Sequence, residues 1–130
     1  MQLLNDEKII NTAYAKICYR QDGIIHVHYT DHYFTLEDSK KLFSIIRENC
    51  PWDVSPIYLS GSTFANQDSD SKKFNGSLEV IKHCSAIAML TDSLGQKILA
   101  NFFIKTIQPN TPTKFFTNED VAIAWLKEYL

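Results

Sequence analysis

Histidines are the first side chains in this 130-residue chain whose spacing suggests chemistry. His26 and His28 are two residues apart in the run IIHVHY, and His32 follows closely. Residues i and i+2 of a β-strand share one face, so the two imidazoles would lie side by side. Such a pair can bind a metal, but a site needs a third or fourth ligand, and none follows at a typical spacing. We therefore expect exposed histidines on a strand face and no bound metal.

A second candidate is the polar, turn-rich segment of residues 60–71. It can recognise a small polar ligand, receive a phosphate, or simply connect two elements through helix-capping residues. Asp68 and Asp70 would repel an incoming anion, and two adjacent lysines would partly offset that repulsion. The candidate residues for binding a partner or a phosphate are Ser60, Ser62, Thr63, Ser69, Ser71, Lys72, Lys73 and Phe74.

Known catalytic patterns are absent from the sequence. Ser93 lies in Asp-Ser-Leu-Gly, which is not the G-x-S-x-G elbow, and no histidine follows it. There is also no P-loop, dinucleotide fingerprint or H-E-x-x-H motif. Cys18, Cys50 and Cys84 form no C-x-x-C pair, so we expect reduced structural thiols, with a reactive Cys84 as the alternative. We predict no catalytic residue and no cofactor.

The composition is that of one globular domain spanning residues 1–130. With 45% hydrophobic and 22% charged residues, the chain can bury a core. A net charge of −2 and a pI of about 6.0 do not favour nucleic acid or an anionic membrane as partner. No apolar run approaches the ~20 residues that span a bilayer, and the N-terminus lacks signal-peptide features. We expect a cytoplasmic protein.

Hydrophobic periodicity divides the chain into five strands and four helices. The predicted strands are residues 13–19, 24–29, 54–60, 85–90 and 113–116, and the predicted helices are about residues 36–50, 71–83, 94–108 and 118–130. An Asp22-Gly23 turn makes the first two strands an antiparallel hairpin. Right-handed crossovers would make the later strands parallel, and the apolar run 85–90 should be internal. The predicted fold is α/β, a five-stranded mixed sheet with four helices in the order ββαβαβαβα.

Capping residues indicate where three of the helices begin. Thr35 is followed three residues on by Asp38, as in a capping box. Asp92 or Ser93 would cap the long third helix. Thr117, with an aspartate three residues on, would cap the last helix.

Apolar stripes indicate how three helices pack. The second helix should bury Phe74, Leu78 and Ile81, and the last helix should largely bury Trp125 beside Leu126. The third helix is apolar on more than one face. Its surplus apolar side chains are either buried under a neighbouring helix or meet a partner, a second copy or a small apolar ligand. They are Leu99, Phe102, Phe103 and Ile107.

Three segments carry a resemblance to a known family: DGIIHVHY…FTLEDSKKL, SAIAMLTDSLGQKILANFFI and PTKFFTNEDVAIAWL. Together they touch most of the chain. The order of elements is similar to the STAS domain, the fold of sulphate transporters and anti-sigma-factor antagonists. It resembles more closely the small stand-alone bacterial SpoIIAA-like proteins of unknown function.

This resemblance implies a regulatory site at the start of the second helix. In anti-sigma antagonists a partner kinase phosphorylates a serine there, and Ser69 and Ser71 occupy that neighbourhood. Ser60 stands where an acidic residue usually closes the preceding strand, and the compact Asp-x-Ser pattern with nearby glycine is missing. We therefore expect partner binding without a phosphorylation switch.

These observations favour a non-catalytic regulatory or protein-interaction module of the STAS-like type. It would bind a protein partner, or a second copy of itself, through residues 60–74. The alternative is a binder of a small apolar ligand between sheet and helices, and an enzyme of unknown class comes third. An apolar cavity of roughly 300 Å³ or more would favour the ligand binder.

Overall fold

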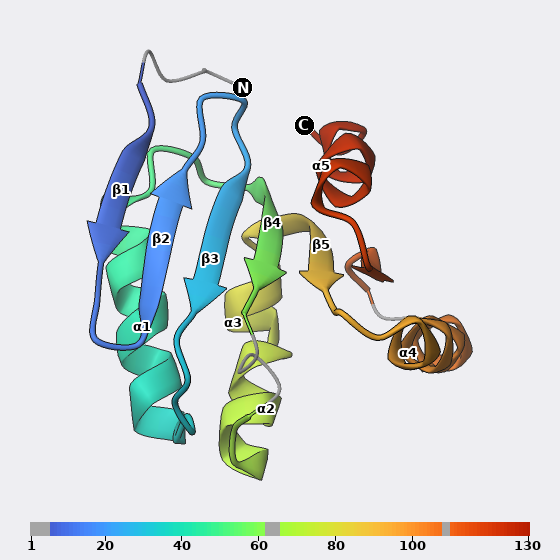
Figure 1. The fold of residues 1–130 in the computed structure, drawn as a ribbon. Helices are drawn as coiled ribbons and strands as arrows, with labels where there is room; N and C mark the ends of the chain where they lie inside the picture. Colours follow the sequence, from blue (N-terminus) through green and yellow to red (C-terminus); the bar gives the residue numbers. More distant parts are fainter. Residues whose placement is uncertain (1–5, 62–65, 108–109) are drawn as a thin grey trace.

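The computed structural model describes residues 6–61, 66–107 and 110–130, apart from the side chains of residues 103, 106 and 107. One six-stranded sheet has the order β1-β2-β3-β4-β5-β6, so sequence neighbours are also neighbours in space (Figure 1). The strands are β1 Lys8–Asn11, β2 Ala15–Tyr19, β3 Ile25–Tyr29, β4 Ser55–Ser60, β5 Cys84–Leu90 and β6 Thr113–Phe116. The helices are α1 Leu36–Asn49, α2 Ser69–Asn75, α3 Leu78–Ile81, α4 Leu94–Ile107 and α5 Glu119–Lys127.

The sheet is mixed, as predicted. β2 is antiparallel to both β1 and β3, and the strands from β3 to β6 are parallel to one another. In the β2–β3 turn, Gly23 has a φ of +94° and the Arg20 N–H donates to the carbonyl of Ile24 at 3.0 Å. This confirms the predicted hairpin. β5 lies between β4 and β6, so the prediction that it is internal is also confirmed.

The prediction of five strands was wrong, because β1 was missed. Its four residues, KIIN, are mostly exposed and show no alternation of polar and apolar side chains. β1 is held instead by pairing with β2, with Ile10 opposite Ile17. Backbone pairing of this kind leaves no periodic signal in the sequence.

The four predicted helical segments are present, but the second is divided into α2 and α3. Gly76 ends α2 and Ser77 is the N-cap of α3. Because the helix is interrupted there, Leu78 does not continue the predicted buried stripe. Its side chain is 72% exposed. The predicted cap Thr117 is also corrected, since the Asn118 side chain accepts the N–H of Val121 instead.

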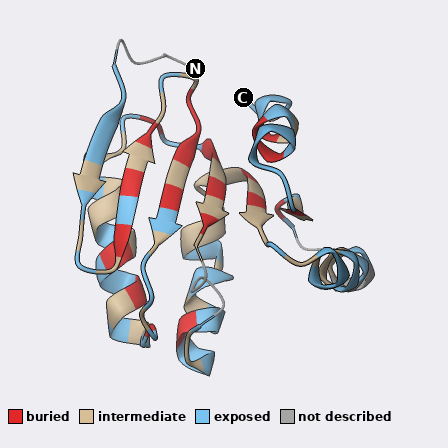
Figure 2. Cartoon of the chain, viewed as in Figure 1, coloured by how far each residue is buried: buried red, intermediate tan, exposed pale blue. Residues whose placement is uncertain are grey.

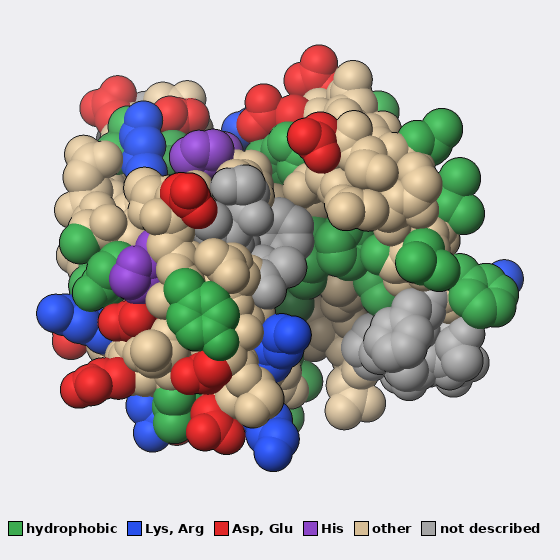
Figure 3. All heavy atoms as spheres, turned by 60° about the horizontal axis from the view of Figure 1, so that its bottom comes forward, with side chains coloured by type: hydrophobic (Ala, Val, Ile, Leu, Met, Phe, Trp, Pro, Cys, Tyr) green, Lys and Arg blue, Asp and Glu red, His purple; other side chains and the backbone are tan. Residues whose placement is uncertain are grey.

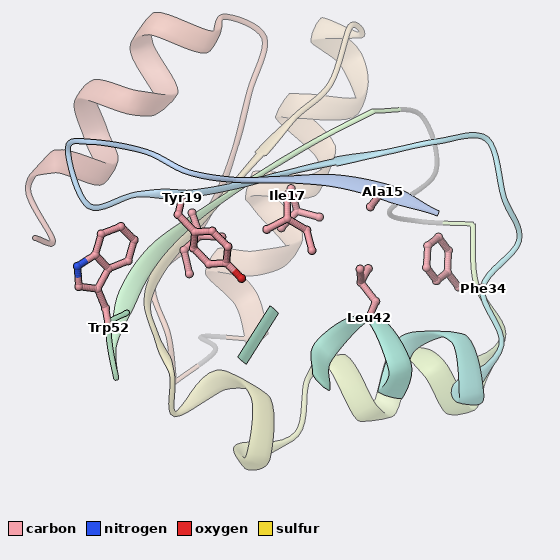
Figure 4. Close-up of a cluster of buried hydrophobic side chains, with 8 residues drawn as sticks. Ala15, Ile17, Tyr19, Phe34, Leu42 and Trp52 are labelled. Carbon is pink, nitrogen blue, oxygen red and sulfur yellow. The ribbon is translucent and has the colours of Figure 1, made fainter. Parts of the chain in front are cut away.

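Helices α1, α2 and α3 cover one face of the sheet, and α5 covers the other (Figures 1 and 4). The first core cluster joins sheet residues such as Ile17 and Val27 to Leu42 of α1. The Tyr19 hydroxyl donates to the carbonyl of Ile46 at 2.6 Å and ties α1 to β2. Figure 2 shows the buried residues concentrated on the central strands and on the inner sides of these helices.

The second core cluster lies between the sheet and α5. Tyr58 and Ala88 from the sheet pack there with Leu126, and all three are fully buried. Trp125, predicted to be largely buried, is only partly buried and contacts Phe116 and Tyr129 at the rim of the cluster. Leu126, and not Trp125, is therefore the fully buried large side chain through which α5 packs on the sheet.

Helix α4 lies beyond the edge strand β6 (Figure 1). The N–H of Gln96 donates to Ser93 Oγ at 3.2 Å, which confirms Ser93 as its cap. The Asn101 side chain clamps the helix to β6, because Nδ2 donates to the Phe115 carbonyl and Oδ1 accepts the Phe115 N–H, at 3.1 and 2.8 Å. This arrangement leaves much of α4 in contact with solvent (Figure 2).

Candidate functional site

A cavity of about 180 Å³ lies between the sheet and helices α1, α2 and α3. We call it the inner cavity. Its apolar wall comes from alternate residues of β3, β4 and β5 and from the facing side of α1, with a contribution from α3. The apolar lining residues are Ile25, Val27, Phe34, Leu42, Phe43, Ile46, Ile57, Leu59, Val80, Ile87 and Met89.

The interruption of the second helix determines which of its side chains face this space. A continuous helix with Phe74, Leu78 and Ile81 on one stripe would have packed against α1 and the sheet. With the break at Gly76 and Ser77, Leu78 turns toward solvent and Val80 is the α3 side chain that reaches the cavity. The predicted apolar stripe failed at this break.

Two ionisable groups in the cavity wall stay protonated at neutral pH. Burial raises the pKa of the Tyr29 phenol to about 12 and the pKa of the Cys84 thiol to about 11. The thiolate is the reactive form of cysteine. The environment of Cys84 therefore disfavours the alternative of a reactive thiol, and the cysteines at 18, 50 and 84 are all free, as expected.

A wider, open cleft of about 420 Å³ adjoins the inner cavity, and we call it the outer cleft. Phe43, Arg47 and His83 line both spaces. The cleft has polar and apolar surface in similar amounts and carries several cationic side chains. Its remaining lining residues are Lys40, Ser44, Phe74, Glu79 and Lys82.

Arg47 and His83 are positioned by the backbone that precedes β4. Arg47 Nη2 donates to the carbonyls of Trp52 and Asp53 at 3.2 and 3.4 Å. His83 Nδ1 lies 2.9 Å from the same Asp53 carbonyl, which can only accept, so Nδ1 carries the donated hydrogen. Both side chains are thus held at the junction of the inner cavity and the outer cleft.

Ser60 and the two strand histidines form a cluster on the opposite face of the sheet. His26 Nε2 and His28 Nδ1 lie 2.7 and 2.8 Å from Ser60 Oγ. The pairing of β3 with β4 brings them together, because His28 is in register with Ser60. The expectation of exposed histidines holds for His28 only of these two, since His26 is half-buried and packs in a tilted arrangement against Tyr58, with 4.5 Å between the ring centroids.

The charge state of His26 follows from its burial. Loss of hydration, with a smaller contribution from His28, lowers the pKa of His26 to about 4. A neutral imidazole can exchange one hydrogen bond with a hydroxyl, either as donor or as acceptor. His32 does not join the cluster, because it pairs with Asp38 at 3.0 Å and stacks on Tyr14.

The predicted loop begins with a close approach of two backbones. Gly61 has a φ of +95°, and a Cβ placed on it would lie 2.4 Å from the Tyr29 carbonyl oxygen. Only glycine fits this position without a shift of the backbone. Of the loop candidates, Ser62 and Thr63 lie outside the described residues.

The two serines of α2 differ in accessibility. Ser69 is the first residue of the helix and is exposed. Ser71 is fully buried, where its hydroxyl donates to Gln67 Oε1 at 2.7 Å and is hydrogen-bonded to Ser39. Its N–H donates to the cap Asp68. Of these two serines, only Ser69 presents its hydroxyl to a modifying enzyme.

The remaining loop candidates lie on α2. Lys72 and Lys73 are exposed and line neither the inner cavity nor the outer cleft. Phe74 is half-buried, packs edge-to-face on Phe43 at 5.7 Å and lines the outer cleft. Of these three residues, only Phe74 lines one of the two spaces, the outer cleft.

Helix α4 carries an apolar stripe that the sequence analysis anticipated in part. Leu94, Ile98, Leu99 and Phe102 are between 62% and 71% exposed. Hydrophobic side chains are visible along the right-hand edge of the molecule in Figure 3, the side on which α4 lies. The predicted contributions of residues 103 and 107 lie outside the described side chains.

Two kinds of site have no counterpart in the part of the chain that the structure describes. No group of three or more His, Cys, Asp or Glu side chains is arranged to hold a metal ion. No helix in those ranges is both long and apolar enough to cross a bilayer.

Comparisons with known proteins give a family and matches among solved structures. The chain is similar to an uncharacterized DUF3478-family protein from Shewanella loihica PV-4, described as having a SpoIIAA-like fold. The two are 16% identical over 92% of this chain and 91% of that one, with a TM-score of 0.49.

No curated protein matches the chain. A family described as "Domain of unknown function (DUF7793)" matches residues 18–130. That match takes in the residues from Cys18 in β2 to the C-terminus, and thus all described residues of the inner cavity, the outer cleft and the histidine cluster. The chain therefore belongs to the DUF7793 family.

Proposed function

We propose that this protein is a non-catalytic binding module that holds a small apolar ligand between the sheet and helices α1–α3. The observation that carries the proposal is the inner cavity, about 180 Å³ with a predominantly apolar wall. An engineered apolar cavity of about 150 Å³ in another protein binds benzene. Burial of apolar surface contributes roughly 25 cal/mol per Å². The volume is below the roughly 300 Å³ that we expected of a ligand binder, but the apolar wall and the boundary shared with the outer cleft still favour the ligand binder, second in the sequence analysis, over the regulatory module.

The size of the cavity limits the ligand. It is smaller than the roughly 300 Å³ typical of sites for drug-sized molecules. A single ring or a chain of about six to eight carbons matches its volume. Anything larger has to extend into the outer cleft.

The non-catalytic character is supported by the state of the reactive side chains. Ser60 is buried, is hydrogen-bonded to two histidines and lines neither of the two cavities. The raised pKa of Cys84 keeps its thiol protonated. Ser60 is therefore separated from the space where a ligand would bind, and Cys84, which lines that space, is not present as the thiolate nucleophile.

A cavity-filling substitution tests the proposal. Val80→Phe places an aromatic ring in the inner cavity, whereas Leu78→Phe adds the same ring on the exposed side of α3. We expect calorimetry to show binding of 1-octanol to the wild type, at least tenfold weaker binding to Val80→Phe, and unchanged binding to Leu78→Phe. Circular dichroism would check that each variant is folded. A wild-type protein that does not bind 1-octanol, or equal binding by both variants, would refute the proposal.

We also propose, as a second function, self-association through α4. It is favoured by the exposed stripe of Leu94, Ile98, Leu99 and Phe102, which lies on a helix without acidic residues. Such a stripe is self-complementary, because two copies related by a two-fold axis can pair the same side chains. We assign the interaction to α4 rather than to residues 60–74, because the exposed side chains that the structure describes in that segment are polar or charged, whereas those of the α4 stripe are apolar.

A further inference from the structure

We infer that the ligand carries one negative charge, as a carboxylate at the end of a short apolar chain. This inference rests on the proposed function and adds the chemical class of the ligand. The chain would occupy the inner cavity, and the carboxylate would lie in the outer cleft.

The two spaces share one boundary. Phe43, Arg47 and His83 line both of them. The Phe43 ring lies 5.7 Å from the Phe74 ring and 6.2 Å from the His83 ring, measured between centroids. A ligand that crosses this boundary meets apolar side chains on the inner side and charged side chains on the outer side. That is the environment of an amphipathic molecule with one polar end.

The outer cleft is positive although the whole chain has a net charge of −2. Lys40, Arg47 and Lys82 contribute three positive charges, and Glu79 contributes one negative charge. None of the three cationic side chains forms a salt bridge with any of the residues that the structure describes. Their charges are therefore not neutralised locally, and an anion in the cleft is stabilised.

Arg47 is the cation best placed to orient a carboxylate. Both of its backbone contacts use Nη2, so the donors on Nε and Nη1 are not consumed by them. A guanidinium has five N–H donors in a planar fork that matches a carboxylate. The carbonyls of Trp52 and Asp53 hold this fork at the boundary shared by the two spaces.

Glu79 favours a singly charged head group over a doubly charged one. Its carboxylate lines the same cleft as the three cations, so it repels each additional negative charge of a ligand. A carboxylate carries one negative charge at neutral pH, whereas a phosphate monoester carries nearly two.

The first experiment compares two probes of equal chain length. Octanoate and 1-octanol share the eight-carbon chain and differ in the charge of the head group. We expect calorimetry to show octanoate binding roughly tenfold more tightly than 1-octanol at low salt, with the difference shrinking as salt screens the cleft. Equal affinities would refute the carboxylate and leave the proposed function intact. Failure of both probes to bind would refute the proposed function itself.

The second experiment locates the charge. Lys40→Gln/Lys82→Gln removes two cations that line the cleft, and Lys72→Gln/Lys73→Gln removes two exposed cations that do not. Exposed charges contribute modestly, so we expect the first pair to weaken octanoate binding roughly 3- to 10-fold and to leave 1-octanol binding unchanged. The second pair should bind both probes as the wild type does. Equal effects of the two pairs on octanoate would refute the assignment to the outer cleft.

Discussion

At the scale of single residues, the cluster of His26, His28 and Ser60 shows how a polar group is accommodated on a mostly apolar sheet face. Ser60 is buried, and its hydroxyl is satisfied by two imidazole nitrogens. A buried hydroxyl without such partners would cost roughly 1–3 kcal/mol. The histidines therefore have a structural role that their spacing alone did not reveal.

His26 makes the stability of the protein depend on pH. Burial lowers its pKa to about 4 in the folded state, below the 6.5 of an unperturbed histidine. As the pH falls below about 6.5, His26 becomes protonated in the unfolded chain, whereas in the folded chain it stays neutral until about pH 4. The stability contributed by neutral His26 is thus complete above pH 6.5 and is lost between pH 6.5 and 4.

We predict that His26→Gln weakens this dependence. Glutamine keeps an amide that can hydrogen-bond Ser60 but does not titrate. Between pH 7 and 4.5 the wild type should lose on the order of 1–2 kcal/mol more stability than the variant, a value reduced for the partial exposure of His26. Urea unfolding at several pH values measures this difference. Parallel curves for the two proteins would show that His26 does not titrate in this range.

At the scale of elements, α5 is attached to the sheet by one side of the helix. Ala122, Ile123 and Leu126 are buried there, while Trp125 lies at the rim and Val121 is 55% exposed. The sequence placed Trp125 and Leu126 on the same stripe, because adjacent residues are only about 100° apart around a helix. Contact with Tyr58 and Ala88 decides which of the two is central.

We predict that Leu126→Ala destabilises the protein more than Trp125→Ala. Leu126 is fully buried, so its truncation should cost about 3–4 kcal/mol, whereas Trp125→Ala at the rim should cost about 1–2 kcal/mol. Val121→Ala, on the exposed side, should change the free energy of unfolding by less than about 0.5 kcal/mol. Chemical denaturation gives all three values. A larger loss for Trp125→Ala than for Leu126→Ala would mean that α5 packs in another orientation.

At the scale of the whole molecule, the two proposed functions use different parts of the fold. The inner cavity and the outer cleft lie on the face covered by α1–α3, whereas the apolar stripe lies on α4 beyond β6 (Figure 1). Loss of one function by substitution should therefore leave the other unchanged. Effects of well-separated substitutions are usually additive.

We predict that Leu99→Glu abolishes self-association. Leu99 is 71% exposed in the middle of the α4 stripe, and a carboxylate there would be buried in the interface between two copies. Sedimentation equilibrium should show a dissociation constant at least tenfold higher than that of the wild type. Leu78→Glu, on the exposed side of α3, is the matched control and should associate normally. A wild-type chain that is monomeric at every concentration would contradict the role assigned to α4.

The sequence by itself determined the alternation of strands and helices. The hairpin at Asp22-Gly23, the capping box of Thr35 and the internal position of β5 all follow from local chemistry or from a continuous apolar run. Such signals lie within a few residues of one another, so they can be read without tertiary structure. The same holds for the division of β3 into an apolar face and a face with the two histidines.

Tertiary structure alone decided the features that depend on distant segments. β1 forms because β2 offers an unpaired edge, and Ser60 meets His26 because β3 and β4 are parallel neighbours. The interruption of the helix at Gly76 leaves Leu78 exposed and Val80 in the wall of the inner cavity. Each outcome is set by packing and pairing between segments far apart in the chain, which local propensity does not specify.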